Sequence, residues 1–191
     1  MYPNVTIIPN NTNCKYELGA YKVGINYVIN NNLSFDYYIF TQDTLIIKNR
    51  YDFNILKNNN VTACTIYAYW YDNIWRGNIE AHQECSNILN NIGLCDNFEN
   101  ITFCWCNSFI LQGSVIKEFL SLTHNIEITH KGHSMYSERF LARILYELNE
   151  HKNFDIDGLI TLLKYNSWTV NLFDPIESHY FVKRNQFKPF N

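Results

Sequence analysis

One stretch, Phe35-Asp-Tyr-Tyr-Ile-Phe-Thr-Gln-Asp-Thr-Leu-Ile-Ile-Lys48, decides the predicted fold. Its first half is an aromatic and β-branched run without Gly or Pro, which is typical of a buried strand. The polar residues Gln42, Asp43 and Thr44 then interrupt the apolar run. Open α/β sheets bind ligands at the carboxyl ends of their strands, so a carboxylate at this place faces a crevice. We therefore treat Asp43 as a candidate site residue.

Asp43 has two interpretations on the sequence alone. A carboxylate oxygen suits Mg²⁺ or Mn²⁺, and such an ion commonly accompanies a diphosphate. Alternatively, Asp43 ends the strand in a turn and accepts hydrogen bonds from nearby backbone amides. The local pattern is compatible with both, so the rest of the chain has to distinguish them.

Composition limits the class of protein. A chain of 191 residues that is 47% hydrophobic and 17% charged predicts one core and one domain, covering residues 1–191. The formal net charge of -3 argues against general nucleic-acid binding, which needs a concentrated basic surface. No apolar run has the length of a membrane span, and the first residues lack the features of a signal peptide. We expect a soluble cytoplasmic protein with its six cysteines reduced.

The beginning of the chain predicts a strand, a helix and a second strand. Val5–Ile8 is β-branched and ends before Pro9, residues 15–29 carry apolar residues at helical spacing, and residues 36–40 form the next strand. Such a βαβ unit joins parallel strands by a helical crossover. The sequence therefore predicts an α/β domain with a mainly parallel central sheet flanked by helices. In the loop after the first strand, Asn10 and Asn11 could contact a base or a ribose.

Several common classes of site are disfavoured. Gly19 and Gly24 do not form the dinucleotide-binding fingerprint, and no phosphate-binding Gly-Lys-Ser/Thr loop is present. His130-Lys-Gly-His133, predicted to lie in a loop, and Cys104-Trp-Cys106 lack the partner spacing of a zinc site. A Rossmann dehydrogenase, a P-loop NTPase and a structural zinc protein are therefore not expected.

In the later part of the chain, the residue pattern predicts a strand within residues 61–70 and a helix over 84–92 ended by Gly93. It then predicts a strand over 101–107, a connection over 108–112 and a helix from Ser114 to about Leu122. Residues 137–148 are strongly amphipathic and predict another helix, with Ser134 or Ser137 as its cap. Glu138 then lies in the first turn, where the helix dipole favours a carboxylate. A helix-stabilising role for Glu138 is therefore the alternative to a catalytic one.

Three segments together resemble a known family. Lys15-Tyr-Glu-Leu-Gly-Ala-Tyr-Lys22, Asp36-Tyr-Tyr-Ile-Phe-Thr-Gln-Asp-Thr44 and Ser137-Glu-Arg-Phe-Leu-Ala-Arg143 are similar to small GT-A-type glycosyltransferases of large DNA viruses and bacterial polysaccharide clusters. The resemblance follows most of the chain in order. It implies a GT-A, Rossmann-like fold, in which a nucleotide-sugar lies across the carboxyl ends of the first strands. The family's Asp-x-Asp metal motif corresponds here to Thr41-Gln42-Asp43, with only the last acid kept.

The resemblance also implies site residues. Asp43 matches the metal-binding acid, and His179 near the end of the chain could complete the metal shell. Glu138 matches an acid that faces the acceptor or donor sugar, and Asp157 is the second candidate catalytic residue. The candidate residues for binding the donor are Ile8, Asn10, Asn11, Tyr21, Gln42 and Lys183.

The expected function is transfer of a sugar from a nucleotide-sugar to a glycan or glycoprotein acceptor, assisted by Mn²⁺ or Mg²⁺. Residues 1–100 would form the donor half, and 101–191 the acceptor half and a closing tail. A viral member would act in the host cytoplasm. The alternative is a catalytically inactive module that binds a nucleotide-sugar or glycan on the same fold. Thr41 in place of the first acid favours this alternative, while Glu138, His179 and Lys183 favour the enzyme.

Overall fold

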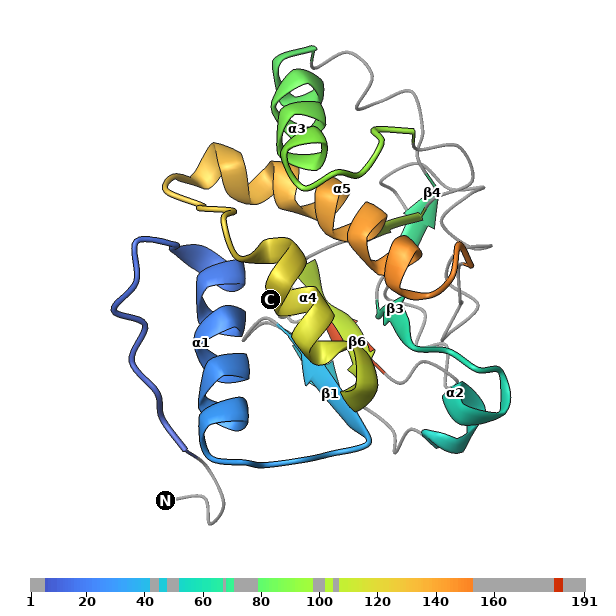
Figure 1. Cartoon of the computed structure of the whole chain (residues 1–191). Helices are drawn as coiled ribbons and strands as arrows, with labels where there is room; N and C mark the ends of the chain where they lie inside the picture. The colour runs from blue at the N-terminus through green and yellow to red at the C-terminus, as the bar shows by residue number, and fades with distance from the viewer. Residues whose placement is uncertain are drawn as a thin grey trace, which may run out of the picture.

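The computed structural model consists of helices and short strands connected by irregular segments (Figure 1). No helix in its described part combines the length and apolar composition needed to cross a membrane. The structure describes residues 6–41, 45–47, 52–66, 68–70, 79–97, 102–104, 107–152 and 181–183. The helices are α1 (Tyr16–Asn30), α2 (Asn54–Asn58), α3 (Ile79–Asn91), α4 (Ile116–Thr123, preceded by a 3₁₀ turn over Gly113–Val115) and α5 (Lys131–Leu148). The strands are β1 (Tyr37–Phe40), β2 (Leu45–Ile47), β3 (Ala63–Thr65), β4 (Ala68–Trp70), β5 (Thr102–Cys104), β6 (Phe109–Gln112) and β7 (Phe181–Lys183).

A three-stranded sheet with the order β1-β6-β3 forms the centre of the described structure. Phe109 of β6 lies opposite Phe40 on one side and opposite Thr65 on the other, and both pairings are antiparallel. Two further antiparallel pairs join β2 to β7 and β4 to β5. Every strand pair that the structure describes is therefore antiparallel. The mainly parallel sheet of the GT-A prediction finds no support in these residues.

The first strand of the predicted βαβ unit is also absent where the structure describes it. Residues 6–8 pair with no strand, and the Ile7 side chain is 90% exposed. A β-branched segment becomes a strand only when a neighbour completes its hydrogen-bond ladder, and this segment ends at Pro9. The chain meets residues 126–128 only later, just before α1, where the Lys15 N–H donates to the Ile128 carbonyl at 2.7 Å. Helix α1 therefore does not connect two parallel strands formed from residues 6–8 and 37–40.

Successive side chains of the sheet alternate between two faces, as the pleat requires. Phe40, Phe109 and Leu111 point to the face covered by α1, α4 and α5, which we call the helical face. Tyr37 and Ile110 point to the opposite face, which packs on α2 and which we call the α2 face. Figure 1 shows α1, α4 and α5 grouped around β1 and β6, with α2 apart from them.

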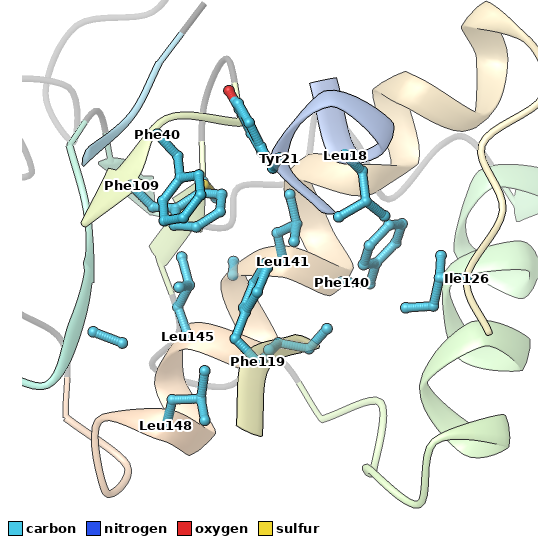
Figure 2. Packing of buried hydrophobic residues seen from close by; sticks show 14 of the residues in the cluster. Leu18, Tyr21, Phe40, Phe109, Phe119, Ile126, Phe140, Leu141, Leu145 and Leu148 are labelled. Atoms are coloured by element: carbon cyan, nitrogen blue, oxygen red, sulfur yellow. The ribbon is translucent and has the colours of Figure 1, made fainter. Parts of the chain in front are cut away.

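Aromatic rings fill the centre of the helical face. Phe40 and Phe109 stack with their centroids 4.7 Å apart, and Phe119 of α4 lies 5.2 Å from Phe109. Helix α5 adds Leu141 and Leu145, which lie next to these rings in Figure 2. Burial of such large apolar side chains is the main favourable term in folding, so this cluster holds the helices on the sheet.

Most helix predictions are confirmed, but α3 begins at Ile79, five residues before its predicted start, and two further assignments were wrong. Helices over residues 15–29, 84–92 and 114–122 correspond to α1, α3 and α4, and Gly93 follows α3 with φ +78°. Residues 109–112, predicted as a connection, are the central strand β6. Helix α5 begins at Lys131, with His130 as N-cap, so His130–His133 is not a loop.

Candidate functional site

The sequence predicts a ligand at the end of the sheet where β1 stops. Phe40 is the last residue of β1, and the polar segment 42–44 that follows lies outside the described residues. Phe40 pairs with Phe109, the first residue of β6, which also pairs with Thr65, the last residue of β3. We call this end of the sheet, defined by Phe40, Thr65 and Phe109, the Phe40 end.

Helix α5 is anchored at the Phe40 end by a buried hydrogen bond. The Ser137 hydroxyl donates to Asn107 Oδ1 at 2.7 Å, and both residues are 2% exposed. Asn107 comes two residues before Phe109 and has φ +50°, a conformation that Asn tolerates better than most residues. The segment Ser137–Arg139, which contains the candidate catalytic Glu138, therefore starts beside the carboxyl ends of β1 and β3.

Glu138 is half-buried and interacts with other groups of the protein. Because α5 begins at Lys131, Glu138 lies beyond the first turn of the helix, and no acid occupies that turn. The helix dipole acts mainly within the first and last turns. The helix-dipole explanation for this carboxylate is therefore wrong.

Arg139 brings a positive charge into the same segment and is 2% exposed. Burial raises the pKa of the Cys85 thiol on α3 to about 12, and the Arg139 charge opposes that rise. Arg139 is therefore close enough to α3 to act on its buried groups, and it has interactions of its own within the protein. Ser137 and Arg139, the residues on either side of Glu138, therefore both interact with other segments of the protein.

The C-terminal strand approaches the chain just after Asp43. Strand β7 pairs with β2, and Lys183 lies opposite Leu45, which is two residues beyond Asp43 in the sequence. Asp43 itself lies outside the described residues, as does His179, which precedes β7. The pairing places the backbone of one predicted donor-binding residue, Lys183, beside the strand that begins after the predicted metal ligand.

Tyr21, a predicted donor-binding residue, belongs to the core of the helical face. It is 8% exposed, and its ring lies edge-on to Phe40 at 5.2 Å and to Phe109 at 5.5 Å. Figure 2 shows this ring beside both phenylalanines, with its hydroxyl directed away from the leucines of α5. The position gives Tyr21 a packing role at the Phe40 end instead of an exposed surface for a nucleotide.

Asn10 organises the turn before α1. Its side-chain amide donates to the Cys14 carbonyl at 2.9 Å, and its Oδ1 accepts from the Thr12 hydroxyl at 2.7 Å. Asn11 is exposed and Ile8 is half-buried in the same segment. With these bonds made, the Asn10 side chain serves the local fold, so Asn11 keeps the more available amide of the two.

The remaining predicted residues, Gln42 and Asp157, also lie outside the described residues. In the part of the chain that the structure describes, no three His, Cys, Asp or Glu side chains gather to hold a metal. At the start of α5, the His130 and His133 rings have centroids 3.6 Å apart, and His133 Nε2 lies 3.7 Å from Glu84 Oε1. These two imidazoles and one carboxylate lie near the surface and do not form a group that could hold a metal ion.

Two adjacent clefts lie at the opposite end of the sheet, on the α2 face. The first, which we call the polar cleft, has a volume of about 410 Å³, and the second, the aromatic cleft, about 350 Å³. Tyr37 and Lys57 line both. The polar cleft is completed by Asn60, Val61, Thr62, Gln112, Glu150 and Lys152, and the aromatic cleft by Asp36, Ile39, Phe53 and Asn54.

These cleft residues were not predicted from the sequence. They come from four separate segments, the start of β1, the α2 region, the end of β6 and the turn after α5, so no local motif unites them. A weak signal was Asn60, because Asn is among the few residues that tolerate φ +52° at a helix end.

No protein-family model, curated protein or solved structure shows significant similarity to the chain.

Proposed function

We propose that the protein is a glycosyltransferase that moves a sugar from a nucleotide-sugar to a glycan or protein-linked acceptor. In this proposal Asp43, with His179, binds Mn²⁺ or Mg²⁺, and Gln42 contacts the donor. Departure of a nucleoside diphosphate develops negative charge, which a divalent cation and Lys183 would neutralise. Glu138 faces the reacting sugar, as a base in an inverting reaction or as an orienting group in a retaining one.

The observation that carries the proposal is the pairing of β7 with β2. Lys183 lies opposite Leu45, so a residue from the end of the chain comes to the strand that starts two residues after Asp43. Residues this far apart in sequence meet only through the tertiary structure. The Ser137 to Asn107 hydrogen bond adds support, because it fixes the segment with Glu138 beside the end of β1. The proposal rests on these contacts and on the sequence resemblance, since the antiparallel strand pairs do not support the GT-A fold.

A binding module without catalysis is the second candidate, favoured by Thr41 in place of the first metal acid. The two candidates differ in one measurable product. An enzyme releases a nucleoside diphosphate from its donor, whereas a module binds the donor and leaves it intact.

The test is donor hydrolysis with Mn²⁺ across a panel of UDP-, GDP- and dTDP-sugars, with binding followed by thermal shift. We expect Asp43→Asn to abolish metal-stimulated release, because the metal loses its carboxylate ligand. We expect Glu138→Gln to slow turnover on the order of a hundredfold if it transfers a proton. The controls are Glu118→Gln, at an exposed acid of α4, and Asp96→Asn, at an exposed acid after α3 that accepts a hydrogen bond from the Ser86 hydroxyl.

Each result has a distinct meaning. Full Mn²⁺-dependent activity in Asp43→Asn would show that this residue only ends a strand. Normal turnover with a lower melting temperature in Glu138→Gln would remove Glu138 from the reaction. Binding of a donor without release of a nucleoside diphosphate would establish the binding module instead of the enzyme.

A further inference from the structure

The walls of the polar cleft are held in place by hydrogen bonds between distant segments. The Thr62 N–H donates to Asn149 Oδ1 at 2.9 Å, and the Gln112 N–H donates to the Thr62 carbonyl at 2.7 Å. The Asn149 side-chain amide donates to the Lys152 carbonyl at 2.8 Å. These bonds tie the start of β3, the end of β6 and the turn after α5 together. The cleft therefore exists before a ligand arrives, which lowers the entropy that binding has to offset.

The charges of the two clefts are balanced. Lys57 Nζ lies 3.2 Å from Asp36 Oδ2, and Lys152 Nζ lies 3.5 Å from Glu150 Oε2. Each ammonium thus has a carboxylate beside it, so the clefts present no concentrated positive field. A phosphate, a nucleotide or a nucleic acid would meet as much repulsion as attraction here. An uncharged ligand avoids that conflict.

The polar groups that line the first cleft suit hydroxyl groups. The Asn60 side chain makes no hydrogen bond to the described protein residues, so its carbonyl can accept and its NH₂ can donate. Gln112 Oε1 accepts from the Ser114 hydroxyl at 3.2 Å, which leaves the Gln112 NH₂ as a donor. A hydroxyl both donates and accepts, so it is satisfied by this mixture of amides, ammonium groups and carboxylates.

The aromatic cleft supplies an apolar wall next to these polar groups. The Tyr37 and Phe53 rings stack with centroids 5.5 Å apart and an interplanar angle of 26°. Ile39 of β1 lines the same cleft and is 39% exposed. A sugar ring has an apolar C–H face and a rim of hydroxyls, so it can cover an apolar wall while its rim reaches polar side chains.

We infer that the two clefts together bind a short neutral oligosaccharide across Tyr37 and Lys57, the residues that they share. Two joined clefts suit an elongated ligand with repeated polar units better than one compact molecule. Each volume is at the small end of the range of about 300–1,000 Å³ that is usual for small-ligand sites. The polar cleft lies at the opposite end of β1 from the Phe40 end, the aromatic cleft extends along the α2 face to Ile39, and neither cleft is lined by Glu138 or Lys183.

The role of this site as an anchor for the acceptor glycan rests on the proposed function. Binding of the oligosaccharide itself does not require catalysis, because the cleft residues take no part in the proposed reaction. The inference can therefore fail while the proposed function holds, and the reverse is also true.

The experiment is titration of the ¹⁵N-labelled full chain with neutral oligosaccharides, followed by amide chemical shifts. The probes are cellotetraose, chitotetraose and mannotetraose, with inorganic pyrophosphate as the anionic comparison. We expect at least one oligosaccharide to shift the amides of Lys57, Asn60 and Gln112. Pyrophosphate should leave these amides unchanged.

Asn60→Gly is the decisive variant, because it removes the amide while glycine accepts the positive φ without strain. The matched control is Asn32→Gly, since Asn32 is also exposed and has φ +53°, but lies in the turn after α1 outside both clefts. We expect Asn60→Gly to weaken binding about three- to tenfold, the usual worth of one neutral hydrogen bond. Asn32→Gly should bind like the wild type.

Three results of the titrations with oligosaccharides would overturn the inference, and a competition with pyrophosphate supplies a fourth. They are the absence of shifts with every oligosaccharide, shifts confined to residues outside the clefts, and equal weakening by Asn32→Gly and Asn60→Gly. Displacement of the oligosaccharide by pyrophosphate would also contradict the neutral ligand. Donor hydrolysis measured on the same samples keeps the two proposals apart, since loss of oligosaccharide binding in an active enzyme removes only the cleft assignment.

Discussion

The two faces of the central sheet are built differently. On the helical face, Phe40 and Phe109 of the sheet stack on each other, and Phe40 also stacks on Phe119 of α4. Phe40 is the most exposed of the three rings, at 8%. On the α2 face, the five-residue helix α2 contributes one fully buried side chain, Leu56, beside Ile110. The two clefts lie at the margin of this smaller cluster. The difference indicates that the helical face provides most of the stability, while the α2 face leaves part of the sheet accessible to a ligand.

The largest expected effect is on the helical face. Phe109→Ala should lower the free energy of unfolding by about 3–5 kcal/mol, because it removes a fully buried ring and leaves a cavity between two others. Urea unfolding followed by circular dichroism measures this change. The control is Ile39→Ala on the same sheet, at a partly exposed position of the α2 face. Equal losses in the two variants would show that the two faces contribute alike.

The next effect concerns the α2 face. Leu56→Ala should cost about 2–3 kcal/mol, near the lower end of the range for buried leucines, because the small cluster around Leu56 can partly collapse. We also expect it to open this face without unfolding the helical one.

Alkylation of cysteines can detect that local opening. Cys64 of β3 faces α2 and is buried, and burial raises the pKa of its thiol, so it should react slowly in the wild type. Cys95 is exposed, and a hydrogen bond from Arg143 lowers the pKa of its thiol, so it serves as the reactive reference. In Leu56→Ala, Cys64 should react faster while Cys104, on the helical face, stays protected. Simultaneous exposure of Cys64 and Cys104 would mean that the two faces unfold together.

The smallest expected effect is at the rim of the clefts. The ion pair between Lys57 and Asp36 joins side chains that are 56% and 79% exposed, so solvent screens most of their attraction. A double-mutant cycle with Lys57→Met and Asp36→Asn should give a coupling energy below about 1 kcal/mol in the free protein. A larger coupling energy would mean that this ion pair contributes to the stability of the contact between α2 and β1.

The local elements could be predicted because their signals are local. Apolar spacing along residues 15–29 and 137–148 is a property of neighbouring residues, and α1 and α5 follow it. The aromatic run before Thr41 correctly indicated the strand β1, but the expected burial of the strand was wrong, because only Phe40 is buried and Ile39 is 39% exposed. The prediction of a connection over residues 109–112 was wrong, because a run of three apolar residues and one glutamine is too short to distinguish a connection from a central strand. Only their neighbours on both sides, β1 and β3, make them a strand.

The candidate site was less predictable than the fold elements. Tyr21 has a ring that suits either a ligand or a core, and its packing against Phe40 and Phe109 assigned it to the core. Glu138 was expected in the first turn of a helix, but α5 begins at Lys131. Gly132 and His133 in its first turn have low helix propensity, so the sequence did not indicate this earlier start. Periodicity identifies the middle of a helix better than its ends.

The sequence by itself determined the positions of α1, α4 and most of α5, because hydrogen bonds and side-chain spacing within a few residues define a helix. It also indicated β1 through an aromatic and β-branched composition. The tertiary structure alone decided that β1 pairs antiparallel with β6, that Lys183 lies opposite Leu45, and that four separate segments enclose the polar and aromatic clefts. These contacts join residues tens of positions apart. Their free energy depends on which surfaces the whole chain can bury together, and no local pattern encodes that choice.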